Sequence, residues 1–373
     1  MAGAGNRPLV PFNIRDLSPY VAGKTIAEVK EEYQPPQVSK LASNENRLGC
    51  SPNVEPEVIK AMQEIQDYPD PASLQLRDVL ADINNVERDN ILVAAGSESV
   101  ISILCRTFFL NHEEAITVDA TFVGFFVQAN IRGISINKIP VTDDYRYDLD
   151  ATADAITERT KMIYIANPNN PTGTYVTDAE FKRFMRRVPD DVLVVMDEAY
   201  FEYAREVSDY PHSLDYEYDN IITLRTFSKA YGLAGFRIGY AIASERIVSE
   251  MMKTKLTFEP TTPAQAAALA ALGDQKFLKK TIDTVEEGKR QLYSFFEEHD
   301  VSYVPSISNS VMMILPDEQQ AIDFTQAMLE EGVILRRINA FGLPNCVRIT
   351  IGREKEMKHF ERSFEKVMKT QEI

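Results

Sequence analysis

A lysine and an arginine stand eight residues apart in the stretch TFSKAYGLAGFRIGY, which covers residues 226–240. The hydroxyls of Thr226 and Ser228 come just before Lys229, and small residues separate Lys229 from Arg237. Hydroxyls donate hydrogen bonds and a guanidinium clamps a dianion through its planar fork, so these residues together could hold a phosphate. The amine beside them could attack a carbonyl group. The alternative for an isolated Ser-Lys pair is a surface lysine on a loop.

Three further clusters carry groups that could act on the same ligand. Asp197 ends the apolar run VLVVMD, where a carboxylate is either a helix cap or the partner of a cation. Tyr200 follows three residues later and could point to the same place if the chain turns helical. The segment NPNNPTG, residues 167–173, is a rigid turn that carries the amide of Asn170. Other polar or aromatic residues that follow predicted strands are Ser97, Glu98 and Phe122.

These groups together indicate one ligand with a phosphate, an aldehyde, a protonated ring nitrogen, a flat ring face and a phenolic oxygen. Pyridoxal 5'-phosphate has all five features, and a protein's part is to orient it and tune its electronics. Lys229 would take the aldehyde and Asp197 the ring nitrogen. The phosphate would lie against Ser97, Thr226, Ser228 and Arg237, the ring face against Phe122, and the phenolic oxygen against Asn170 and Tyr200.

Short apolar runs alternate with helix-like segments through the first two thirds of the chain. Continuous Val, Ile and Leu are typical of parallel strands covered on both faces, and such sheets bind ligands at the carboxyl ends of their strands. We therefore predict an α/β fold with a mostly parallel central sheet flanked by helices. Helices are predicted after Gly96 and over Asp150–Arg159 and Asp178–Val188, and strands over Asn90–Ala94, Ala115–Val118, Met162–Ala166, Val192–Met196, Ile221–Leu224 and Ile238–Ile242.

The pattern changes after about residue 250, and the remaining segments predict a smaller α+β domain. With 373 residues the chain exceeds what one hydrophobic core usually serves. We expect residues 1–40 to form an N-terminal arm and part of the small domain, 41–255 the large cofactor-binding domain, and 256–373 the small domain. Its predicted helices are Ala264–Leu272, Phe277–His299 and a last one from Lys355, and its strands are Ser310–Leu315, Val333–Leu335 and Val347–Ile351.

The composition of the chain limits the classes of partner that we expect it to bind. The formal net charge is −16, and an acidic surface repels phosphate backbones, so we expect no nucleic acid. No signal segment or membrane-length apolar run is visible, so we expect no membrane contact. Cys50, Cys105 and Cys346 lie far apart, which favours reduced thiols in a cytoplasmic protein, and we expect no metal.

Six ordered motifs give the chain a resemblance to a known family. It resembles the fold type I pyridoxal-phosphate aminotransferases, which are aspartate-aminotransferase-like, and within them the histidinol-phosphate aminotransferase subgroup. The likeness covers nearly the whole chain. The motifs are LASNEN (41–46), YPDPAS (68–73), NPNNPTGT (167–174), DEAYFEY (197–203), RTFSKAYGLAGFRIGY (225–240) and FGLPNCVRITIG (341–352).

The resemblance implies roles for the matching residues. Lys229 would form a Schiff base with the cofactor and then move the substrate's α-proton, while Asp197 keeps the ring an electron sink. Ser97 and Glu98 would meet the phosphate through backbone amides at a helix N-terminus. Tyr68 would reach the phosphate from the neighbouring subunit, which implies a homodimer. The substrate would be bound by Tyr20, Asn44, Arg336 and Arg348.

The implied reaction converts L-histidinol phosphate and 2-oxoglutarate to imidazole acetol phosphate and L-glutamate, a step of histidine biosynthesis. Two arginines suit both substrates, because a guanidinium fork binds a phosphate monoester and a carboxylate alike. The alternatives are an aminotransferase for aromatic amino acids and a pyridoxal-phosphate-dependent decarboxylase of a phosphorylated amino acid. A catalytically silent binding domain of the same fold would be colourless.

Five places depart from the family's usual pattern. They are Arg47 and Ala120 where proline is usual, Glu98 where aspartate is usual, Phe125 where tyrosine is common, and the segment 258–265. The cofactor motifs are intact, so these departures concern the substrate rather than the reaction. We expect Arg47 to add a cation near the pocket mouth.

Overall fold

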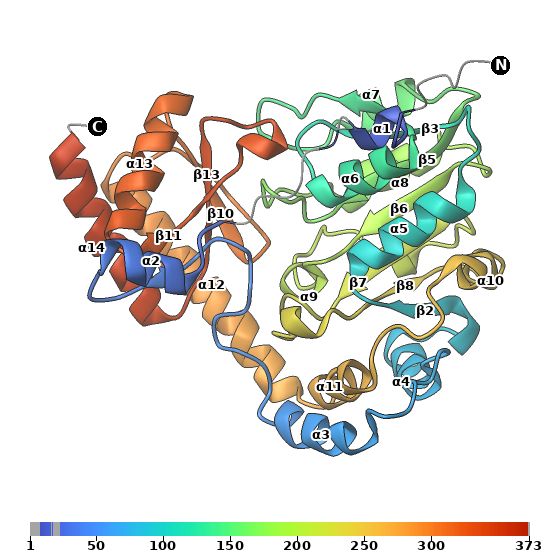
Figure 1. Ribbon diagram of the computed structural model, residues 1–373. Coiled ribbons are helices and arrows are strands. Elements are labelled where there is room, and N and C mark those ends of the chain that lie inside the picture. The colour runs from blue at the N-terminus through green and yellow to red at the C-terminus, as the bar shows by residue number, and fades with distance from the viewer. Residues whose placement is uncertain (1–7, 16, 18–22, 372–373) are drawn as a thin grey trace, which may run out of the picture.

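The computed structural model describes residues 8–15, 17 and 23–371 and has two lobes of unequal size. Figure 1 shows the larger lobe on the right, built on one sheet, and the smaller lobe on the left, with the long helix α12 (Gln275–Glu298) running between them. This arrangement confirms the predicted fold class.

The larger lobe holds, within the described residues, a sheet of seven strands in the order β2-β8-β7-β6-β5-β3-β4. Strand β8 runs antiparallel to both its neighbours, and the other pairs are parallel. Strand β4 was not predicted, because its sequence SINKI is polar and lies at a sheet edge. The strands are β2 (Ile91–Ala94), β3 (Glu114–Val118), β4 (Ser135–Ile139), β5 (Thr160–Ala166), β6 (Leu193–Asp197), β7 (Ile221–Thr226) and β8 (Gly239–Ile242).

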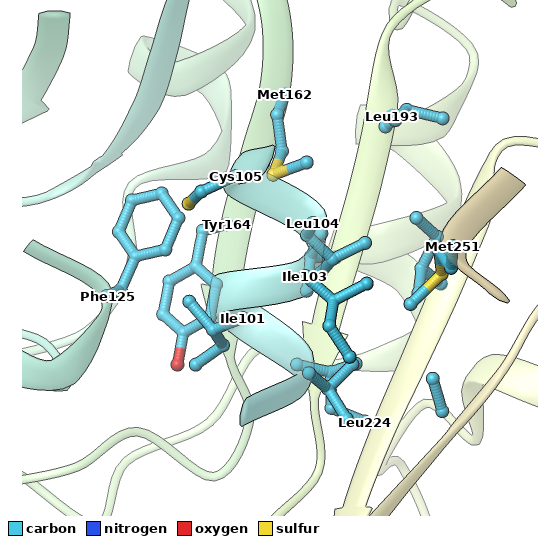
Figure 2. Close-up of a cluster of buried hydrophobic side chains, with 14 of the residues drawn as sticks. Ile101, Ile103, Leu104, Cys105, Phe125, Met162, Tyr164, Leu193, Leu224 and Met251 are labelled. Atoms are coloured by element: carbon cyan, nitrogen blue, oxygen red, sulfur yellow. The ribbon is translucent and has the colours of Figure 1, made fainter. Parts of the chain in front are cut away.

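Helices cover both faces of this sheet, as continuous apolar strands require. Along β5, Met162 and Tyr164 pack against α5 (Ser97–Phe108) and α6 (Val123–Arg132), while Ile163 and Ile165 pack on the other face. Figure 2 shows the first of these cores, where side chains of α5 lie against those of β5 to β7. Other helices of this lobe are α3 (Val54–Ala61), α4 (Leu74–Asn84), α7 (Leu149–Asp154), α8 (Asp178–Met185), α9 (Phe201–Ala204), α10 (Glu245–Thr254) and α11 (Thr262–Leu272).

Helix α7 is shorter than the predicted helix over 150–159. The helix ends because side-chain hydroxyls accept hydrogen bonds from backbone N–H groups that a further helical turn would need. The backbone N–H of Thr157 donates to Thr160 Oγ1, and the N–H of Arg159 donates to Thr157 Oγ1. The chain therefore turns into β5 instead of continuing the helix.

The smaller lobe contains a four-stranded sheet in the order β12-β13-β10-β9, as far as the chain is described. Strand β1 (Ser39–Lys40), from the N-terminal part of the chain, pairs with β11 (Val333–Ile334) in a separate two-stranded parallel sheet. Helix α11 was expected in the small domain, but it packs in the core of the larger lobe beside β2 and β8. The domain bounds at residues 40 and 255 stay a prediction. The remaining elements are α1 (Phe12–Arg15), α2 (Ile26–Tyr33), β9 (Tyr303–Val304), β10 (Ser310–Ile314), α13 (Glu318–Glu330), β12 (Arg336–Arg337), β13 (Cys346–Thr350) and α14 (Glu354–Gln371).

Among the helices of the described residues, none combines the length and apolar character that crossing a membrane requires.

Candidate active site

Ten of the predicted site residues line one cavity of about 250 Å³ at the carboxyl edge of the large sheet. They meet because the parallel strands end at the same edge, where β6 pairs Asp197 with Ala166 of β5 and with Leu224 of β7. The ten residues are Ser97, Glu98, Phe122, Asn170, Asp197, Tyr200, Thr226, Ser228, Lys229 and Arg237.

One end of the cavity is built to bind an anion. Gly96 has a φ of +94° and precedes α5 without a side-chain cap, so the first N–H groups of that helix are available. A Cβ added to Gly96 would lie 3.0 Å from Arg237 Nη2, so the guanidinium lies directly against this turn. Thr226 and Ser228, whose hydroxyls are 3.0 Å apart, line the same cavity. Amides, hydroxyls and a guanidinium suit a phosphate.

Asp197 is a buried carboxylate, and one of its two oxygens has no hydrogen-bond partner among the described residues. It is 4% exposed, and its Oδ2 accepts a hydrogen bond of 2.5 Å from the hydroxyl of Tyr164. Its Oδ1 is buried and has no hydrogen-bond partner among the described residues. Burial raises the pKa of Asp197 to about 6, although the Tyr164 hydrogen bond and the charge of Lys229 both lower it. A cationic ring nitrogen would satisfy the unpartnered oxygen.

The amine and the phenol lie on the same side of the cavity. Lys229 Nζ is 3.4 Å from the carbonyl oxygen of Ser43 and 5.8 Å from the centre of the Tyr200 ring. The Tyr200 hydroxyl accepts a hydrogen bond of 2.7 Å from Asn44 Nδ2. Asn44 itself is fixed by Thr350, since its backbone N–H lies 2.9 Å from Thr350 Oγ1. The LASNEN segment and β13 therefore hold the phenol in place.

Two arginines of the smaller lobe stand opposite each other in the register of β12 and β13. Arg348 pairs with Arg336, and like charges directly opposite on neighbouring strands are unfavourable unless an anion lies near them. Arg348 is 5% exposed, and its guanidinium donates to Asn170 Oδ1 and, at 3.0 Å, to the carbonyl of Ala42. Asn170 lines the cavity, so Arg348 adjoins it.

Other predicted residues lie outside the cavity. Tyr68 is 79% exposed and stacks on Phe258, with the ring centres 4.1 Å apart. Tyr20 lies outside the described residues. Arg47 does not line the cavity, because its guanidinium bonds Glu356 at 3.0 Å near the start of α14. The extra cation expected at the pocket mouth is thus neutralised by a buried carboxylate.

Sequence reasoning missed some residues that the structure brings to this place. Tyr164 lies in the apolar run of β5, where nothing in the sequence marks its hydroxyl as part of a site. Ser43 and Glu45 line the cavity, and Glu45 pairs with Lys40 at 2.8 Å. Both belong to the LASNEN motif, so the sequence could have indicated them as site residues, but Asn44 was the one residue of that motif predicted to lie in the site.

The residues present fit pyridoxal 5'-phosphate. The anion site at α5, the unpartnered Asp197 oxygen and the Lys229 amine share one cavity, as a phosphate, a ring nitrogen and an aldehyde of one molecule require. Fold and site together define an enzyme of the pyridoxal-phosphate-dependent class.

Comparisons with known proteins agree with this class. The family model described as aminotransferase class I and II matches residues 36–364. The histidinol-phosphate aminotransferase of Geobacillus sp. (strain WCH70) is 40% identical over 366 residues, covering 98% of this chain and 99% of that protein. The chain therefore belongs to the aminotransferase class I and II family, whose cofactor is pyridoxal 5'-phosphate.

Solved structures give the same result for the fold. The crystal structure of histidinol-phosphate aminotransferase from Sinorhizobium meliloti, in complex with pyridoxal-5'-phosphate, matches with a TM-score of 0.89 at 25% identity. The match covers 99% of this chain and all of that one. An aspartate aminotransferase from Thermus thermophilus, at 22% identity, matches with a TM-score of 0.83 over 97% of this chain and all of that one, and it bears on the fold alone.

Proposed function

We propose that this aminotransferase transfers the amino group of L-histidinol phosphate to 2-oxoglutarate, giving imidazole acetol phosphate and L-glutamate. The observation that carries the proposal is the pair of Arg336 and Arg348, which face each other in the strand register, with Arg348 bonded to Asn170 of the cavity. One substrate ends in a phosphate monoester and the other in a carboxylate, and a guanidinium fork binds both. Full-length relatives at 40% identity are histidinol-phosphate aminotransferases, which supports the same substrates.

The chain's residues would divide the work as follows. When bound, pyridoxal 5'-phosphate supplies an electron sink for the charge that develops at the substrate's α-carbon. Lys229 Nζ would hold the aldehyde carbon and later move the α-proton, since it is the amine that lines the cavity. Asp197 would keep the proton on the ring nitrogen. Tyr200 and Asn170 would orient the phenolic oxygen, and Phe122 would cover the ring.

The remaining predicted residues complete this proposal. The phosphate would be bound by Ser97, Glu98, Thr226, Ser228 and Arg237, and the substrate pocket would include Tyr20 and Asn44. Tyr68 would bind the cofactor phosphate of a partner subunit in a homodimer. Exposed apolar side chains in the segments that carry Tyr68 and its stacking partner Phe258 support such an interface, namely Ile59, Met62, Ile65, Leu256 and Phe258. We place the protein in the cytoplasm, in keeping with three free cysteines.

Half-reactions test the substrate directly. The purified protein, loaded with cofactor, is mixed with one amino donor at a time, and the loss of its yellow absorbance is followed. We expect histidinol phosphate and glutamate to bleach the colour, and phenylalanine to do so with a kcat/KM at least about tenfold lower. Faster reaction with phenylalanine would identify an aromatic aminotransferase instead. Carbon dioxide release without amino transfer would identify a decarboxylase, and a colourless protein would contradict the enzyme assignment.

A further inference from the structure

We propose that Tyr164 is a positioning residue that sets the proton affinity of Asp197 and orients its free oxygen toward the cofactor's ring nitrogen. This inference rests on the proposed function, because it assigns a task to a buried hydroxyl behind the cofactor site. The juxtaposition that carries it is the hydrogen bond of 2.5 Å between the Tyr164 hydroxyl and Asp197 Oδ2.

The sheet register explains why the two side chains meet. Strands β5 and β6 are parallel neighbours, and Ala166 pairs with Asp197. Side chains alternate along a strand, so Tyr164, two residues before Ala166, lies on the same face as Asp197. From that diagonal position its long ring reaches the carboxylate. Both residues are buried, so water does not compete for this hydrogen bond.

A second contact fixes the tyrosine ring. Phe125 of α6 stacks on Tyr164, with ring centres 4.3 Å apart and planes 7° from parallel. Figure 2 shows the two rings side by side. Phenylalanine has no hydroxyl, so it offers the Tyr164 hydroxyl no competing partner. Among the described residues, the Tyr164 hydroxyl makes its hydrogen bond to Asp197 alone.

The two carboxylate oxygens of Asp197 have different surroundings, and this difference indicates the role of the Tyr164 hydrogen bond. Oδ2 is occupied by Tyr164, and Oδ1 is buried without a hydrogen-bond partner in the described chain. A carboxylate held at one oxygen cannot rotate freely, so the other oxygen keeps one direction. A hydrogen bond to the charged form also favours the anion, which Asp197 must be if the ring nitrogen is to keep its proton.

The groups around Asp197 differ in whether they favour its charged or its neutral form. Burial is the largest influence and raises the pKa of Asp197, and Glu198 raises it further, whereas the Tyr164 hydroxyl, the backbone N–H of Ala199 and the charge of Lys229 lower it. Tyr147 and Tyr210 also interact with Asp197, each as a neutral phenol whose pKa is raised by burial. Lys229 is committed to the cofactor when the site is loaded. Tyr164 is then the side chain, among those named, that still favours the Asp197 anion.

Tyr164→Phe tests the inference, because it removes only the hydroxyl and keeps the ring that stacks on Phe125. With a more basic Asp197, the ring nitrogen gives up its proton and withdraws fewer electrons. We expect kcat to fall about tenfold or more with KM little changed. The pH midpoint of the bound cofactor's absorbance, measured without substrate, should rise by at least about half a unit. Tyr164→3-fluorotyrosine, a stronger donor, should move that midpoint downward.

Tyr147→Phe is the matched control. Tyr147 is also buried, but its hydroxyl forms hydrogen bonds with Thr121 and with the backbone N–H of Ala166 rather than with Asp197. We expect it to leave the midpoint unchanged. Placing Tyr164→Phe in an Asp197→Asn background should move neither midpoint nor kcat beyond the single Asp197 variant, because the hydroxyl acts through that carboxylate.

The outcomes distinguish a failure of the proposed function from a failure of the inference about Tyr164. If the wild-type protein binds no cofactor or transfers no amino group, the proposed function fails. If the wild type is active and Tyr164→Phe folds but keeps the wild-type midpoint, this inference alone is wrong. Should Tyr164→Phe fail to fold, the fluorotyrosine variant decides, and an unchanged midpoint there also overturns the inference.

Discussion

A substitution of Lys229 should abolish catalysis while leaving cofactor binding in place. Its amine lines the cavity, while the anion site of Gly96, α5 and Arg237 lies apart from it. Lys229→Ala should therefore still bind pyridoxal 5'-phosphate through the phosphate, but should lose at least about 10³-fold in turnover. Turnover is measured by glutamate formation and binding by dialysis equilibrium.

Lys182→Ala, on the outer face of α8, is the matched control for that experiment. Its amine pairs with Asp178 on the surface, so both turnover and binding should stay at the wild-type level. Near-normal turnover in Lys229→Ala would show that another group moves the α-proton. Loss of cofactor in Lys229→Ala would show that the phosphate site alone is too weak to hold it.

Residues of the site differed in how far the sequence could reveal them. Asp197, Lys229 and Arg237 follow strand ends, and parallel strands bring their ends together, so local patterns sufficed. The Tyr164 hydroxyl could not be foreseen, since an apolar run does not tell which side chain faces a carboxylate. The partner of Arg47 could not be foreseen either, because Glu356 lies 309 residues away along the chain.

At the scale of elements, apolar periodicity predicted the buried strands and missed what is polar or locally capped. Strand β4 escaped because its sequence is polar and only one neighbour pairs with it. Helix α7 was predicted too long because Thr157 and Thr160 bond backbone groups that the helical pattern does not show. Neither β4 nor α7 contributes a residue to the lining of the cavity, so the site prediction did not depend on them.

The loop after β1 and the start of α14 are joined by one buried carboxylate. Glu356, whose side chain is 3% exposed, accepts hydrogen bonds from Arg47 and Arg353. Burial raises the pKa of Glu356, but the hydrogen bonds from both arginines outweigh it and lower the pKa below 4.5. Glu356→Gln leaves the two guanidiniums without their anion and should cost about 2–4 kcal/mol of unfolding free energy at pH 7.

The pH dependence of that loss follows from the sign of the pKa shift. A lowered pKa in the folded state adds stability above the unfolded value, and this stability disappears as pH falls through the folded value. The gap between wild type and Glu356→Gln, measured by urea unfolding at fixed protein concentration, should therefore be largest near pH 7 and narrow below about pH 4. Glu354→Gln, at an exposed neighbour paired with Lys358, should change little. A gap that stays constant with pH would contradict the ion-pair explanation.

At the scale of the whole molecule, the proposed homodimer makes a prediction for Tyr68. Its ring is exposed, stacks on Phe258 and does not line the cavity of its own chain. If Tyr68 binds the phosphate in a partner's site, Tyr68→Ala should lower activity at least about tenfold. Tyr218→Ala, at an exposed tyrosine elsewhere, should not.

Mixed dimers test whether the contribution crosses the interface. Tyr68→Ala and Lys229→Ala subunits are unfolded together, refolded as an equal mixture and assayed. A hybrid dimer has one site with both Lys229 and the partner's Tyr68 intact, so the mixture should regain on the order of a quarter of wild-type activity. Each parent treated alone should stay low. If hybrids form, as seen with tags of different mass, and no activity returns, Tyr68 acts within its own chain or not at all.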